Sequence, residues 1–190
     1  MKKQTEPISY LLIFLVAISL ISTILFYFLP YIRKSQDETK VNLIYNKLFG
    51  SKDSLIEAVR KAILTGEQTR IDAAFEVNWN ITSKTIEVTF YSSVSPFSDN
   101  NAWVLIEGCT KQVCYFGLDP FYKIEGKARK IEDTYEITYR LTAIDVKQDN
   151  KDLKINFIPS KNLWTSRFVI VSLRNFDAST NTYNIFIDVS

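Results

Sequence analysis

The sequence predicts one N-terminal transmembrane α-helix followed by a mainly-β domain, an antiparallel Ig-like β-sandwich with one short docking helix. Three observations support this fold class: an uncharged apolar run, a short amphipathic stretch, and a long region of alternating apolar and polar residues. We expect an N-terminal signal and transmembrane helix over 1–32, a helical stalk and docking helix over 33–66, and an extracytoplasmic β-sandwich domain over 67–190.

The apolar run from Ile8 to Leu29 is long enough to cross a bilayer. Its 22 residues would extend about 33 Å as a helix, close to the ~30 Å thickness of a hydrocarbon core. A cleaved secretory signal is the alternative, because Lys2 and Lys3 precede the run. Such a signal has an apolar core of about 7–15 residues and a small-residue cleavage site. Here bulky aromatic residues and Pro30 end the run instead, so we expect a retained helix in contact with membrane lipid.

The start of the chain resembles a known type of signal peptide. Lys2-Lys3-Gln4-Thr5-Glu6-Pro7-Ile8, followed at once by the apolar run, is similar to the class III signal of archaeal type IV pilin-like proteins. In that family a peptidase cuts on the cytoplasmic side of the helix and leaves the helix intact. The resemblance implies processing residues Lys2, Lys3, Gln4, Thr5 and Glu6, with the amino terminus inside and the rest outside. The family usually has Gly or Ala at the position of Gln4, so the sequence departs from the pattern there.

Two interpretations of Glu6 stay open. If the chain is cut after Gln4, the Glu6 carboxylate lies next to the new ammonium group of Thr5, which it can neutralise within the chain or in a neighbouring subunit. Alternatively, Glu6 and Pro7 only start the helix, since a carboxylate is favourable at a helix N-terminus and Pro is tolerated at the first helical position.

The order of apolar helix, charged stalk, short helix and strands also resembles archaeal pilins over residues 1 to about 93. The resemblance implies a structural subunit or minor component of an archaeal type IV pilus-like filament, extracellular, with self-association or other pilin-like subunits as partners and a role in cell adhesion. The alternative is a membrane-anchored β-sandwich binding or stator module, similar to archaellum accessory proteins, which holds an envelope or surface-layer protein.

The stalk carries an apolar stripe. Val41, Ile44, Tyr45 and Leu48 fall at helical spacing, and we expect this helix to end near Gly50. The stripe packs on the chain's own domain or on a neighbouring subunit; we favour the first.

A second helix is predicted to begin at Ser54. Ser54 and Glu57 have the spacing of a capping box, and Gly66 stands where a C-terminal cap belongs. Ile56, Val59 and Ile63 form its apolar face. We expect this short helix to dock on the sheet that follows.

The period changes to two at Ile71, which predicts strands. An antiparallel hairpin is expected from two alternating stretches, in which Ile71, Ala73, Phe75, Val77, Trp79 and Ile81 share one face and Ile86, Val88 and Phe90 follow. Further strands are predicted at 102–106, 113–116, 135–141, 153–157, 168–173 and 183–189. Because residues 168–171 are apolar on both faces, we expect a central strand there.

The two cysteines, Cys109 and Cys114, lie between apparent strands. They can face each other across a hairpin and form a disulfide, which suits a domain outside the cytoplasm. Two free buried thiols, or half of a metal site, are the alternatives.

The composition argues against an enzyme. The absence of histidine removes Ser-His-Asp and Cys-His nucleophile systems and nearly all usual zinc sites, and the five scattered glycines form no phosphate-binding loop. The carboxylates of Asp72 and Glu76 sit on the polar face of a strand, where solvation explains them. We therefore expect no catalytic residue, no cofactor and no metal site. The balanced net charge of +2 also argues against nucleic acid.

Asn80-Ile81-Thr82 is the sole N-x-[ST] sequon. Asn80 falls on the polar phase of a strand next to a turn, so an exposed side chain there is a candidate glycosylation site if the domain is outside the cell.

Overall fold

The computed structural model describes residues 5–189, with side chains from Tyr10 onward. Its helices are α1 (Thr5–Tyr45), the π-helical turn η1 (Asn46–Gly50) and α2 (Leu55–Thr65). Its strands are β1 (Thr69–Ile81), β2 (Thr85–Ser92), β3 (Val104–Gly108), β4 (Tyr122–Ile131), β5 (Thr134–Ala143), β6 (Val146–Gln148), β7 (Lys151–Pro159), β8 (Leu163–Asp177) and β9 (Thr182–Val189). The predicted layout of one long apolar helix followed by a β domain with a short helix is confirmed.

The chain divides into two units, with the boundary after Asp37. The described part of the first unit is the apolar portion of α1. Within it the Thr23 hydroxyl donates a hydrogen bond to the Ser19 carbonyl over 2.8 Å, which satisfies this polar group inside the helix. Pro30 lies inside α1. Proline has no N–H to donate to the carbonyl one turn earlier, but the helix continues past it.

The second unit begins at Glu38 and contains the last turns of α1. Val41, Ile44 and Leu48 are buried there. The Tyr45 ring contacts the ring of Tyr139, a residue of β5, with their centroids 5.6 Å apart. The predicted apolar stripe therefore packs on the chain's own β domain, as expected.

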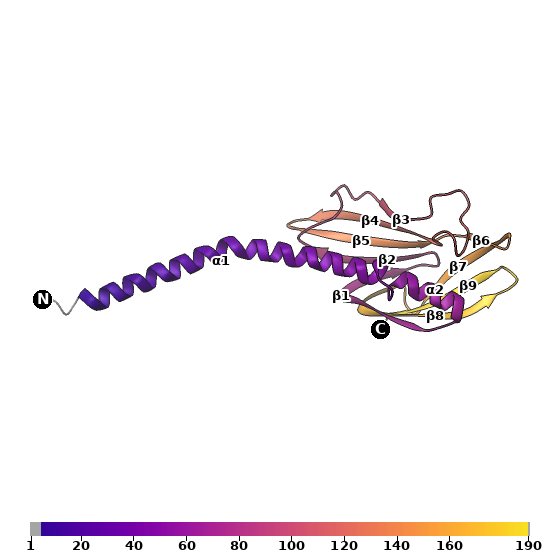
Figure 1. Ribbon diagram of the computed structural model, residues 1–190, viewed down its shortest axis with the longest axis horizontal. Coiled ribbons are helices and arrows are strands. Elements are labelled where there is room, and N and C mark those ends of the chain that lie inside the picture. Colours follow the sequence, from indigo (N-terminus) through magenta and orange to yellow (C-terminus); the bar gives the residue numbers. More distant parts are fainter. Residues whose placement is uncertain (1–4, 190) are drawn as a thin grey trace. The chain divides into compact units, whose positions relative to one another are not determined.

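α2 has the predicted caps. The Ser54 hydroxyl accepts a hydrogen bond from the Glu57 backbone N–H at 3.4 Å, and Gly66 adopts a left-handed φ of 71° at the C-cap. The second half of the predicted capping box is not formed. The Glu57 carboxylate pairs with Arg60 at 3.0 Å, and the Ser54 N–H donates to the Ser51 carbonyl at 3.1 Å. The buried side of α2 packs on β1, β8 and β9, as Figure 1 shows. The docking helix is thus confirmed.

The strands form one nine-stranded sheet in the order β3-β4-β5-β2-β1-β8-β9-β7-β6. All pairs are antiparallel except β7 with β9. β8 lies inside the sheet, as expected for the strand that carries 168–171. The sandwich was predicted as two facing sheets, whereas the strands are hydrogen-bonded into one continuous sheet. α2 and the last turns of α1 pack on it.

The sheet bends so that distant strands meet. The Phe157 N–H of β7 donates to the carbonyl of Ser83, in the turn between β1 and β2, at 2.9 Å. The Lys84 ammonium of the same turn donates to the Ile155 carbonyl at 3.0 Å. This contact encloses the core around fully buried side chains such as Trp79 and Phe157.

The β1–β2 hairpin is confirmed, but β1 contains an irregularity that the alternation did not predict. The register with β8 shifts between Asp72 and Val77, and Ala74 has a φ of 70°. As a result Phe75, expected in the core, is 37% exposed. The bulge interrupts the alternation at Phe75. Ala73 before it and Val77 after it are both buried.

One predicted strand was wrong, and two strands were missed. Residues 113–116 form no strand; they belong to the loop between β3 and β4, where Tyr115 and Phe116 make isolated bridges only. Conversely, β4 and β6 were not predicted. β4 turns Ile124, Gly126 and Ala128 inward, and two of these three are too small to give an apolar signal.

Candidate functional site

The first candidate surface is the apolar part of α1. Its large apolar side chains between Tyr10 and Ile32 are 41% to 79% exposed. In the part of the chain that the structure describes, one helix is long and apolar enough to cross a membrane. Such a surface is suited to contact with lipid or with other apolar helices.

The predicted processing residues lie at the start of this helix. Lys2, Lys3 and Gln4 fall outside the described residues. Thr5 and Glu6 are in the first turn of α1, and their side chains are not among those described. Both interpretations of Glu6 stay predictions.

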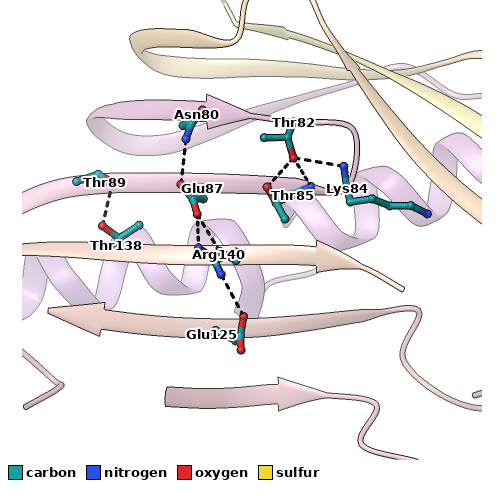
Figure 2. A network of polar contacts seen from close by, with 9 residues as sticks. All are labelled: Asn80, Thr82, Lys84, Thr85, Glu87, Thr89, Glu125, Thr138 and Arg140. Carbon is teal, nitrogen blue, oxygen red and sulfur yellow. Dashed lines mark hydrogen bonds and ion pairs between the residues drawn. The ribbon is translucent and has the colours of Figure 1, made fainter. Parts of the chain in front are cut away.

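The second candidate surface is the outward face of the sheet, where β1, β2, β5 and β4 share a polar network (Figure 2). Glu87 lies at its centre. The Arg140 guanidinium donates to Glu87 through Nε at 2.8 Å and lies 2.7 Å from it through Nη2. Arg140 also lies 3.9 Å from Glu125, and the Asn80 amide donates to Glu87 at 3.0 Å. These contacts tie four strands together.

An aromatic ring covers part of this network. Trp103, just before β3, places the centroid of its ring 3.7 Å from the Arg140 guanidinium carbon and 4.6 Å from the Lys127 ammonium nitrogen. Cation–π contacts of this type hold the segment before β3 against the sheet. A shallow depression of about 700 Å³ lies on the same region, lined by Asn78, Asn80, Glu87, Thr89, Glu136, Leu163, Trp164 and Thr165.

Asn80 of the sequon is exposed, in β1 between Glu87 of β2 and Leu163 of β8. Its amide nitrogen already donates to Glu87. The Thr82 hydroxyl accepts from the Thr85 N–H at 3.0 Å, within the hairpin turn. Glycosylation of Asn80 stays a prediction; in the folded domain its acceptor nitrogen is engaged in the polar network.

Cys109 and Cys114 are joined by a disulfide. It closes the start of the loop between β3 and β4, and not a hairpin of two strands as expected. The loop reaches the edge of the sheet, where the Lys147 N–H donates to the Cys114 carbonyl at 2.7 Å and the Phe116 N–H donates to the Lys147 carbonyl at 2.9 Å. The disulfide thus anchors a loop that pairs with β6.

The buried tyrosines have perturbed acidities. Burial raises the pKa of Tyr139, which lies among the rings of Tyr45, Phe49 and Phe97. Burial also raises the pKa of Tyr122, and its hydroxyl donates to the Glu107 carboxylate at 2.8 Å. Both groups are structural, since each is enclosed by the core or bonded to a strand neighbour.

Asp72, one of the two carboxylates that the sequence offered for chemistry, has a structural partner. Arg167 donates to both oxygens of Asp72 at 2.7 Å, and this hydrogen bonding lowers the pKa of Asp72. Solvation alone was therefore an incomplete account of Asp72. Within residues 10–189, no group of three or more His, Cys, Asp or Glu side chains is arranged to hold a metal ion.

Sequence reasoning missed the polar network, because its members are far apart in the chain. Arg140 is directly opposite Glu87 on one side and Glu125 on the other. Only the strand register brings the three together. Comparison of the chain with known proteins gives no assignment. No family model, no curated protein and no solved structure matches it.

Proposed function

We propose that the chain is a structural subunit or minor component of a type IV pilus-like filament of the archaeal kind. It is inserted in the membrane, or assembled in the filament, through the apolar part of α1. The β domain then lies outside the cytoplasm, where it is available for adhesion to surfaces or other cells.

One observation carries the proposal: α1 runs from Thr5 to Tyr45 as one helix with two kinds of surface. Before Asp37 its large apolar side chains are exposed, whereas Val41 and Ile44 are buried in the β domain. The first surface suits lipid or the helices of neighbouring subunits, and the second fixes the helix to its own domain. The Cys109–Cys114 disulfide also supports an extracytoplasmic domain.

A second candidate function is a membrane-anchored binding or stator module that holds an envelope protein. The specific observation in its favour is the exposed apolar edge strand β3, in which Val104 and Leu105 are 44% and 45% exposed. Edge strands of this type are common attachment points for partners. In this case the N-terminal lysines stay in place and the helix stays in the membrane.

The amino terminus of the native protein distinguishes the two. Filaments are sheared from producing cells, and the chain is identified by mass spectrometry in the filament and membrane fractions. The filament proposal expects the chain in the sheared fraction, beginning at Gln4 or Thr5. A chain that begins at Met1 and is confined to membranes contradicts the filament and favours the anchored module.

A matched variant pair sharpens this test. Glu6→Gln removes the charge that would neutralise a new amino terminus at Thr5, whereas Glu38→Gln removes a charge at the start of the second unit. If filament assembly uses Glu6, the first variant is lost from the sheared fraction and the second is retained. Equal retention of both variants contradicts that role of Glu6.

A further inference from the structure

The nine-stranded sheet has two edges, β3 and β6, and they differ. The outer side of an edge strand presents backbone N–H and C=O groups that a further strand can pair with. At β6 the loop anchored by the disulfide occupies that side, through the two hydrogen bonds between Lys147 and the backbone of Cys114 and Phe116. The β6 edge is therefore closed by the chain itself.

The β3 edge is open among the described residues, and it is apolar. Val104, Leu105 and Ile106 are 44%, 45% and 37% exposed. Because successive side chains of a strand point to opposite faces, both faces of β3 are exposed at this edge. β3 contains no Lys, Arg or Pro, the residues that commonly protect an edge. One bulge interrupts its pairing with β4 between Leu105 and Glu107. Val104 and Leu105 pair with β4 on one side of the bulge, and Glu107 and Gly108 on the other.

Charge distinguishes the possible orientations of a second copy. Glu107 is the sole charged residue of β3. In a parallel in-register pair the two Glu107 carboxylates would lie opposite each other, which is unfavourable. In an antiparallel pair centred on Leu105 they lie four positions apart, about 14 Å along the strand. Ile106 of one copy then lies opposite Val104 of the other, so apolar residues meet apolar residues.

We propose that β3 pairs antiparallel with β3 of a second copy of this chain, so that one sheet continues across a two-fold axis. Since the β6 edge is closed, strand pairing between copies uses β3 on both sides, which makes the contact self-complementary. Chains held in one membrane by α1 have a raised effective concentration, which favours this weak contact. Pairing through β3 is independent of filament assembly, and only the raised effective concentration rests on the proposed membrane insertion.

The test uses the full chain in lipid nanodiscs or detergent, with its native disulfide intact. Leu105→Cys places a thiol at the centre of the proposed pair. Leu163→Cys is the matched control, because Leu163 is 70% exposed in β8, which is an inner strand. Under mild oxidation the first variant is expected to form disulfide-linked dimers at least about tenfold more than the second.

Equilibrium sedimentation of lysine variants provides the second measurement. Leu105→Lys puts two ammonium groups opposite each other and is expected to weaken the dimer about tenfold, a change of about 1.4 kcal/mol. Leu163→Lys is expected to leave the association constant unchanged. Near-UV circular dichroism checks that both variants fold.

Three results overturn the proposal. They are a monomeric wild-type chain at every concentration tested, dimers that do not cross-link through Leu105→Cys, and dimers as strong in Leu105→Lys as in Leu163→Lys. If the wild-type chain is monomeric but binds an unrelated extended peptide in a Leu105-dependent way, the edge serves a foreign strand and not a second copy.

Discussion

At the scale of single residues, the bulge in β1 holds an alanine at a positive φ. Ala74 has a φ of 70°, a region that costs a residue with a Cβ about 1–2 kcal/mol. The conformation is held from both sides. The Asp72 carboxylate accepts from the Ala74 N–H at 2.8 Å and from Arg167. The strained backbone is therefore stabilised by an ion pair between β1 and β8.

We predict that Ala74→Gly stabilises the domain by about 1 kcal/mol, because glycine adopts positive φ without the steric cost. Ala73→Gly is the control. Ala73 is fully buried in the same strand, without a positive φ, so its replacement is expected to destabilise. Urea unfolding of both variants checks this. Destabilisation by Ala74→Gly as large as by Ala73→Gly would show that the positive φ carries no strain.

The buried tyrosines predict a loss of stability in alkali. Burial raises the pKa of Tyr139 in the folded state, above the ordinary value of about 10 for the unfolded chain. The stability from the neutral phenol is therefore complete below about pH 10 and is lost as the pH rises from there towards the folded-state pKa.

We predict that the wild-type domain loses more unfolding free energy between pH 8 and pH 11 than Tyr139→Phe does. The comparison uses denaturant unfolding at both pH values. Lysines titrate equally in the two proteins, so they cancel in the difference. Identical losses would mean that Tyr139 ionises freely in the folded domain.

At the scale of elements, local signals predicted some structures well and others not at all. The Ser54 and Gly66 caps marked α2, and strict alternation marked β2 and β9, since each of these patterns is local in the chain. β4 was missed because its inward positions include Gly126 and Ala128. The structure explains Gly126: a Cβ there would overlap the ring of Phe97, which packs over β4 from the loop after β2.

We predict that Gly126→Ala destabilises the domain by about 1–3 kcal/mol through overpacking against Phe97. In a Phe97→Ala background the same substitution is expected to cost much less, because the ring has gone. A double-mutant cycle measured by thermal unfolding isolates the coupling between the two positions. Additive effects would contradict the contact.

The disulfide loop carries a prediction of its own. Replacement of Cys109 and Cys114 by serine is expected to lower the unfolding free energy by about 2 kcal/mol, on the chain-entropy estimate for a short loop. Without the disulfide the loop is also expected to separate from β6. Hydrogen exchange at the amides of Phe116 and Lys147 is therefore expected to accelerate. Amides of β5, inside the sheet, serve as the control. Unchanged exchange at Lys147 would show that the loop holds the edge without the disulfide.

Part of the polar surface was predictable from the sequence, and part was not. Asn80 of the sequon is exposed, as predicted, because alternation shows which residues of a strand share a face. The bonds from Arg140 to Glu87 and Glu125 depend on the register of β2 with β5 and of β5 with β4. No local pattern encodes that register. The same holds for the loop that closes the β6 edge.

At the scale of the whole molecule, the two units differ in where their apolar side chains lie. The described part of the first unit is helix alone, with its large apolar side chains exposed, whereas the second has its own core of buried residues from Val41 to Val189. A stretch as apolar as 10–32 suits contact with lipid or neighbouring helices, whereas a domain with its own core buries its apolar residues itself. The sequence predicted both parts, because a long apolar run and the alternation of strands are visible without reference to tertiary structure.

The intact mass of the chain after alkaline carbonate extraction of native membranes or filaments tests the proposed membrane helix most directly. If α1 is retained, the chain stays in the carbonate-resistant fraction with a mass that includes residues 10–32. A soluble chain whose mass shows that it begins beyond Pro30 would contradict the membrane helix, and with it both proposed functions.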